Sequence, residues 1–224
     1  EMCIRDSTDG SQTNNNPPVI TNQSFSIAEN SSNGTSVGTV LASDPDAGQT
    51  LSYSIIGGNT NNAFAINPGS GGLTVNNTNA LNFENITTFG LTVRVQDNGQ
   101  GNLYSQATVT VNLTNINENP VINNQAFTIA ENSSNGTSVG TVVASDPDAG
   151  QTLTYSITAG NTSTAFAINA STGAITVNNT AALNFETTPS FGLTVRAQDN
   201  GTGNLFSQAT VTVNLTNLNE IRVI

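Results

Sequence analysis

The sequence contains no lysine, no histidine and no tryptophan, and Cys3 is its single cysteine among 224 residues. One cysteine cannot form an internal disulfide, so stability must come from core packing, from metal, or from both. Four arginines stand against 15 acidic residues, and the formal net charge is −11. This balance argues against nucleic acid as a partner, because phosphate binding needs clustered cations.

Other signals are missing as well. No apolar run approaches the length of a membrane helix, so we expect no direct membrane insertion of this stretch, which also lacks a secretory signal. Without a histidine base, an activated cysteine or a glycine-rich phosphate loop, we expect no enzyme. Glu84 and Asp97 could be imagined as a glycosidase pair. An acidic, cysteine-poor chain rich in Asn, Thr, Ser and Gly suits an extracellular protein.

What the sequence does contain is a repeat with a constant offset of 102 residues and no gaps. Residues 18–118 and 120–220 are identical at 78 of 101 positions. A period of this length fits an array of whole domains, because solenoid repeats are much shorter. We therefore expect a flexible lead-in at 1–17, with residues 1–7 a non-native remnant. Repeat 1 would span 18–118 and repeat 2 would span 119–220, and 221–224 would begin a further linker.

Each repeat is predicted to be all-β, because apolar and polar residues alternate with a period of two between clusters of Gly, Asn, Asp and Pro. Seven short strands in about 100 residues are typical of a Greek-key sandwich, so the expected fold is all-β, with two tandem seven-stranded Greek-key β-sandwiches. The strands expected in repeat 1 are 24–28, 37–43, 51–56, 63–66, 72–76, 89–96 and 104–114. The expected core is Phe25, Val40, Tyr53, Ile55, Phe64, Ile66, Leu81, Phe89, Leu91, Val93, Val109 and Val111.

The acidic residues follow a pattern. Three lie in the lead-in, and the other 12 are six positions that each occur twice. All six positions fall at predicted strand ends or turns, which gather at the two poles of a sandwich. If two repeats join end to end, the glutamates of the first and the aspartates of the second meet. The residues brought together would be Glu29, Glu84, Glu118, Asp146, Asp148 and Asp199.

Such a group of carboxylates repels unless cations neutralise it. Calcium fits best, because it takes six to eight hard oxygen ligands with loose geometry. Zinc or copper would need His or Cys, which neither repeat contains. The alternative is that these acids only form turns, which Asp and Asn also favour. The convergence of all six positions favours metal.

The motifs resemble those of the cadherin repeat in its prokaryotic cadherin-like form. In repeat 1 they are Ala28-Glu29-Asn30, Asp44-Pro45-Asp46-Ala47-Gly48, Leu81-Asn82-Phe83-Glu84, Val95-Gln96-Asp97 and Asn115-Ile116-Asn117-Glu118-Asn119-Pro120. The resemblance implies sandwiches of cadherin/Ig-like type and calcium ligands at the linker. The ligands would be the backbone carbonyls of Ile116 and Asn119 and the side chains of Glu29, Asn82, Glu84, Asn117, Glu118, Asp146, Asp148 and Asp199.

Two residues depart from the family pattern. Asn82 replaces a ligating aspartate, and Glu118 replaces an aspartate in the linker. The lost and the lengthened carboxylate predict two or three ions where three are usual. The outer ends carry half sites with weak or no binding. Asp44, Asp46 and Asp97 would face only Asn15 and Asn16, and Glu131, Glu186 and Glu220 would have no partner repeat.

The resemblance implies a rod-forming segment of a surface or secreted bacterial adhesin, in which calcium stiffens the linker. Family members mediate cell–cell or cell–surface contact through other repeats or surface proteins, and some bind polysaccharide. The alternative is a carbohydrate-binding module with a sugar on one sandwich face. Such sites usually need exposed aromatics, and Tyr104 and Phe206 are the only plausible exposed pair.

Overall fold

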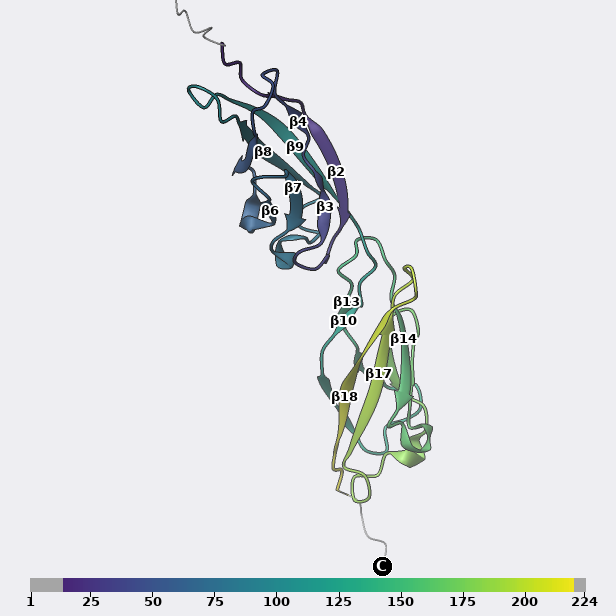
Figure 1. The fold of residues 1–224 in the computed structure, drawn as a ribbon. Coiled ribbons are helices and arrows are strands. Elements are labelled where there is room, and N and C mark those ends of the chain that lie inside the picture. The colour runs from purple at the N-terminus through teal and green to yellow at the C-terminus, as the bar shows by residue number, and fades with distance from the viewer. Residues whose placement is uncertain (1–13, 220–224) are drawn as a thin grey trace, which may run out of the picture. The chain divides into compact units, whose positions relative to one another are not determined.

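The computed structural model describes residues 14–219, which form two compact units whose boundary lies between Ile116 and Asn117 (Figure 1). The expected remnant at 1–7, most of the expected lead-in, Glu220 and residues 221–224 lie outside the described residues. Among the described residues, no helix has the length and apolar character needed to cross a bilayer.

Unit 1 consists of short strands joined by turns and two single-turn 3₁₀ segments. The strands are β1 (Val19–Ile20), β2 (Gln23–Ala28), β3 (Ser36–Thr39), β4 (Ala42–Ser43), β5 (Ser52–Gly57), β6 (Phe64–Ile66), β7 (Gly72–Val75), β8 (Thr88–Gln96) and β9 (Tyr104–Thr114); the 3₁₀ segments are η1 (Thr60–Asn62) and η2 (Thr78–Ala80). One sheet has the order β2-β9-β8-β5, a second has β3-β7-β6, and β1 pairs with β4. All pairs are antiparallel except β2 with β9.

Unit 2 repeats this arrangement with sheet orders β11-β18-β17-β14, β12-β16-β15 and β10-β13. Its strands are β10 (Val121–Ile122), β11 (Gln125–Ala130), β12 (Ser138–Thr141), β13 (Ala144–Ser145), β14 (Thr154–Ala159), β15 (Phe166–Ile168), β16 (Ala174–Val177), β17 (Ser190–Gln198) and β18 (Phe206–Thr216), with η3 (Thr162–Thr164) and η4 (Thr180–Ala182). The prediction of an all-β chain with two tandem sandwiches is confirmed.

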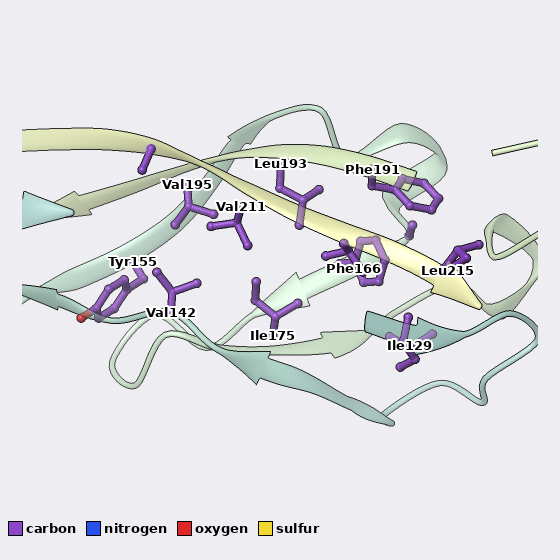
Figure 2. Packing of buried hydrophobic residues seen from close by; sticks show 14 of the residues in the cluster. Ile129, Val142, Tyr155, Phe166, Ile175, Phe191, Leu193, Val195, Val211 and Leu215 are labelled. Carbon is purple, nitrogen blue, oxygen red and sulfur yellow. The ribbon is translucent and has the colours of Figure 1, made fainter. Parts of the chain in front are cut away.

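The alternating pattern decides which face of each long strand is buried. Along β8, Phe89, Leu91, Val93 and Val95 are buried, and the residues between them are partly or fully exposed. In unit 2, Figure 2 shows Leu193 and Val195 opposite Ile175 and Val142, which come from the other layer of the sandwich. Burial of such side chains contributes about 1.5–3 kcal/mol each.

An aromatic pair joins the two layers at one end of each core. Phe166 on β15 meets Phe191 on β17 edge to face, with ring centroids 5.1 Å apart and an interplanar angle of 89° (Figure 2). The pair Phe64 and Phe89 repeats this geometry in unit 1 at 5.0 Å. Edge-to-face pairs add about 0.5–1.5 kcal/mol beyond area burial. The ring pair therefore anchors β6 and β15, which are only three residues long.

One predicted strand is wrong in its continuity. Residues 37–43 form two strands, β3 and β4, that belong to different sheets. Between them, the N–H of the buried Val40 donates to the carbonyl of Gly71, and that of the exposed Leu41 donates to Oε1 of Gln23. The alternating pattern continues through the switch, which is why it predicts a single strand. Strand β1 was missed because two residues show no periodicity.

Candidate metal centre

Glu29 is the central residue at the glutamate end of unit 1, defined here as Glu29, Asn82, Glu84 and Ile116. Its side chain is 1% exposed. Its Oε2 accepts a hydrogen bond from the N–H of Phe83 at 2.8 Å, and its Oε1 accepts one from the N–H of Ile116 at 2.9 Å. Two backbone donors offset the cost of burying the carboxylate. Glu29 thereby ties the end of the unit to its last residue.

The other two predicted side-chain ligands of this end lie in the turn that follows η2. Glu84 is exposed, and one of its carboxylate oxygens lies within 4.8 Å of one from Glu29. The Oδ1 of Asn82 accepts the N–H of Asn85 at 2.8 Å, so this amide closes its own turn. Two carboxylates at such a distance repel in water and attract a shared cation. Unit 1 thus brings Glu29 and Glu84 together, while Asn82 has a turn-forming role.

The aspartate end of unit 2, defined as Asn117, Glu118, Asp146, Asp148 and Asp199, gathers three acids around the first residues of the unit. The Nδ2 of Asn117 donates to Oδ2 of Asp199 at 3.0 Å, and the N–H of Glu118 donates to Oδ2 of Asp148 at 2.8 Å. The N–H of Asp148 also donates to Oδ1 of Asp146 at 3.0 Å. The linker residues are therefore bonded to the aspartates directly. Asn119, predicted to bind through its carbonyl, is exposed.

Two residues of this end were missed by sequence reasoning. Gln151 donates through Nε2 to Oδ1 of Asn117. Gly201 lies directly under the same side chain, since a Cβ there would collide with the Asn117 amide and lie 2.6 Å from Nε2 of Gln151. Their closeness in sequence to the predicted ligands could have pointed to them. Gln151 follows the Asp-Pro-Asp-Ala-Gly turn, and Gly201 follows Asp199 by two residues.

The electrostatics of the aspartate end favour a cation. Burial raises the pKa of Asp146, the backbone N–H of Asp148 offsets part of that rise, and the charges of Asp148 and Asp199 add to it. The Oδ2 of Asp146 is buried and has no hydrogen-bond partner in the structure. A buried acceptor without a donor costs free energy, so this oxygen is suited to a metal ion.

The outer ends of the chain repeat these arrangements. In unit 1, Nδ2 of Asn15 donates to Oδ2 of Asp97 at 3.0 Å, and the N–H of Asn16 donates to Oδ2 of Asp46 at 2.6 Å. The prediction that Asn15 and Asn16 face these aspartates is confirmed. The Oδ2 of Asp44 is buried without a partner, as in its copy.

In unit 2, Glu131 accepts the N–H groups of Phe185 at 2.9 Å and Leu218 at 2.7 Å. These backbone donors, Phe185 before Leu218, hold the pKa of Glu131 below its usual range, although burial acts against them. The Nδ2 of Asn217 donates to Oε1 of Glu186 at 3.0 Å. The same glutamate arrangement thus recurs one repeat later.

The chemistry of the candidate ligands indicates which metal ion they could bind. Every candidate side chain offers a carboxylate or amide oxygen, and neither repeat contains His or Cys. Hard oxygen donors with an unpaired buried oxygen fit calcium and not zinc or copper. The residues present therefore fit a calcium ion.

Comparison with known proteins decides the family. The model of the cadherin domain matches residues 23–114 and, a second time, residues 125–216. The chain belongs to the cadherin family. Each unit is accordingly one cadherin repeat. The linker residues from Ile116 to Asn119 lie between the two matched ranges, and the other residues of the glutamate and aspartate ends lie within them.

Several cadherins are similar in sequence. Cadherin-23 of Rattus norvegicus is 40% identical over 174 residues, which is 75% of the chain and 5% of the relative. Protocadherin Fat 4 of Mus musculus is 35% identical over 215 residues, covering 92% of the chain and 4% of that protein. The chain thus spans about a twentieth of the length of the curated relatives it matches.

Solved cadherin structures show the same fold. The mouse Cadherin-23 EC22-24 structure matches with a TM-score of 0.66 at 26% identity, covering 92% of the chain and 66% of that structure. The extracellular cadherin domains 1-5 of Protocadherin Gamma B2 match with a TM-score of 0.66 at 26% identity, covering 92% of the chain and 41% of that structure. The chain is a tandem pair of cadherin repeats.

Proposed function

We propose that the chain is a calcium-binding, rod-forming segment of an extracellular adhesin, in which calcium stiffens the linker between the repeats. The observation that carries the proposal lies in three consecutive residues. The N–H of Ile116 bonds to Glu29 of unit 1, whereas Asn117 and Glu118 bond to Asp199 and Asp148 of unit 2.

Chain connectivity makes this observation independent of the angle between the units. Consecutive Cα atoms are about 3.8 Å apart, so Ile116 and Glu118 are separated by at most about 7 Å. Carboxylates tied to these residues from both repeats are therefore close to the same short segment. Like charges at such distances repel, and a divalent cation converts the repulsion into attraction.

The ligands that we propose are the side chains of Glu29, Glu84, Asn117, Glu118, Asp146, Asp148 and Asp199 and the carbonyls of Ile116 and Asn119. Asn82, whose oxygen already closes a turn, would contribute least. Calcium, when bound, would neutralise the negative charge of these carboxylates. Ligands drawn from both repeats and the linker would convert binding free energy into stiffness of the joint.

The adhesive role rests on the family. Matching structures comprise extracellular cadherin domains of Protocadherin Gamma B2, so we place this chain at the cell surface or outside the cell. Its partners would be other cadherin repeats or cell-surface proteins. Among the described residues no acid is left over for catalysis, because each belongs to a glutamate or an aspartate end, so we propose no enzymatic role.

Calorimetric titration with calcium tests the site through a matched pair of variants. Asp199 and Asp97 are both 3% exposed and both bonded by an asparagine, but only Asp199 adjoins the linker between repeats. We expect Asp199→Asn to weaken calcium binding at least tenfold and Asp97→Asn to change it less than threefold. Absence of binding, or equal losses in the two variants, would overturn the proposal.

Small-angle scattering tests the mechanical part separately. With saturating calcium we expect a larger maximum dimension and a narrower distribution of shapes than in chelator. Unchanged dimensions alongside measured calcium binding would mean that the ion binds without stiffening the linker.

A further inference from the structure

An arginine lies on the outer face of each four-stranded sheet. Arg94 on β8 stacks on Tyr104 of β9, with the guanidinium carbon 4.0 Å from the ring centroid, and Arg196 stacks on Phe206 at 3.9 Å. A cation over an aromatic ring at this distance is attracted to the ring face. The stack holds the planar guanidinium in one orientation.

These arginines have no acidic neighbour in the sheets. Arg94 lies opposite Ser54 on β5 and Gln106 on β9, and Arg196 lies opposite Ser156 and Gln208. None of the strands of the two four-stranded sheets contains Asp or Glu. In a chain of net charge −11, each sheet therefore carries one positive charge and no negative one.

One donor of each guanidinium, its Nε–H, is unused. The Nε of Arg94 and the Nε of Arg196 are buried and lack hydrogen-bond partners in the structure. The terminal nitrogens of a guanidinium form a fork that matches the two oxygens of a carboxylate. A guanidinium that is held flat, with no acidic residue in its own sheet, is preorganised for such a ligand.

We propose that each of these faces, defined by Arg94, Tyr104, Ser54 and Gln106 and by their copies, binds a sugar bearing a single carboxylate, such as a uronic acid within an otherwise neutral glycan. The guanidinium would take the carboxylate. The aromatic rings, 52% exposed in Tyr104 and 47% in Phe206, would contact the sugar, with serine and glutamine serving its hydroxyls.

Several observations favour this ligand over other anions. One cation per face matches one anion, and the net charge of −11 disfavours a densely charged polymer. An acidic peptide would need apolar contacts for its flanking residues, but the exposed Ile56 beside the face in repeat 1 is Thr158 in repeat 2. What both faces share is the arginine, a ring, hydroxyls and amides.

The two faces differ at their aromatic ring. Tyr104 and Phe206 differ only in the hydroxyl, and both keep the stacked arginine. We therefore expect the two faces to bind the same ligand with affinities within about threefold.

Nuclear magnetic resonance on the calcium-loaded two-repeat chain tests the proposal. Methyl β-glucuronide is the probe, and methyl β-glucoside, which lacks the carboxylate, is the matched control. We expect the glucuronide to shift the Nε–H signals of Arg94 and Arg196 with a Kd on the order of 1 mM, as suits a small ligand. The glucoside should bind at least tenfold more weakly.

The second repeat provides an internal control for the first. In Arg94→Gln, shifts around Tyr104 should disappear while those around Phe206 persist, and Arg196→Gln should show the reverse. Equal binding of glucoside and glucuronide, or shifts that survive both substitutions together, would overturn the site. Tighter binding of N-acetyl-Gly-Glu-Gly-amide than of the glucuronide would assign the faces to acidic peptides and overturn the saccharide.

Discussion

Among single residues, Glu29 and Glu131 illustrate how a buried charge is kept in a cadherin repeat. Both are almost completely buried, and each accepts two backbone N–H groups from segments that are distant in sequence. The carboxylate is satisfied without a cation, so the pole is organised before any ion binds. Preorganisation of this kind reduces the entropy that binding must overcome.

Substitution of these two glutamates separates structure from binding. In Glu29→Gln and Glu131→Gln the amide retains one acceptor and turns an NH₂ group toward the other backbone N–H, so both variants should unfold at lower urea concentration. Only Glu29 adjoins the linker between repeats. Calorimetry should therefore show calcium binding weakened at least tenfold in Glu29→Gln and unchanged in Glu131→Gln. A loss of calcium binding in Glu131→Gln would argue against the proposed site.

The lowered pKa of Glu131 gives a pH prediction with a definite sign. Because the folded-state pKa lies below the unfolded value of about 4.5, Glu131 stabilises unit 2 above that pH, and its contribution is lost as the pH falls further. Urea unfolding in chelator between pH 6 and pH 3, followed by hydrogen exchange in unit 2, should show this loss. Glu131→Gln should make the slope shallower; an unchanged slope would contradict the assignment.

At the scale of elements, the loop after β17 is built around the amide of a linker residue. Gly201 leaves room for the Asn117 side chain, and Gln151 donates to its oxygen. Gly99 has the same relation to Asn15 and Gln49 in unit 1. The loop and the linker are therefore fitted to each other within unit 2.

The close contact between Gly201 and Asn117 predicts the effect of adding one methyl group at position 201. In Gly201→Ala the Cβ would displace Asn117 from Asp199, and calcium binding at the linker should weaken about tenfold. Gly99→Ala introduces the same clash at the outer end of unit 1 and should leave that binding within threefold of the parent. Calcium titration of both variants is the measurement, and equal effects would show that the clash acts on folding and not on the site.

The alternation of apolar and polar residues does not predict where one strand ends and the next begins. Most strands, such as β8 and β9, follow their alternation because one face packs against a core and the other meets solvent. The chain from Val37 to Ser43 also alternates, yet it changes sheets after Val40. The change depends on hydrogen bonds to Gly71 and Gln23, which are distant in sequence and have no local signal.

At the scale of the whole molecule, charge is divided between sheets and ends. Within the described residues, the acids of both repeats lie at strand ends and turns, and the two arginines lie in the four-stranded sheets. Removing cations should therefore loosen the ends and leave the sheets intact. The linker between the repeats is where this loosening would have the largest mechanical effect.

Limited proteolysis at Glu118 measures that loosening directly. A glutamate-specific protease should cleave after Glu118 in chelator and release two fragments of roughly equal size. Calcium should slow this cleavage at least tenfold, because a ligated linker cannot enter a protease cleft. Glu118→Gln should remove the cut in both conditions. Equal cleavage rates with and without calcium would contradict a stiffened linker.

A pair of all-β repeats could be predicted from the sequence, because the period-two alternation and the offset of 102 residues are both visible in the order of the residues. It also identified the acids at strand ends. Tertiary structure alone decided that Glu29 is held by Phe83 and Ile116, that Gly201 and Gln151 seat Asn117, and that Asn82 closes a turn. These contacts join residues that are far apart along the chain or depend on a particular turn geometry, so no local pattern encodes them.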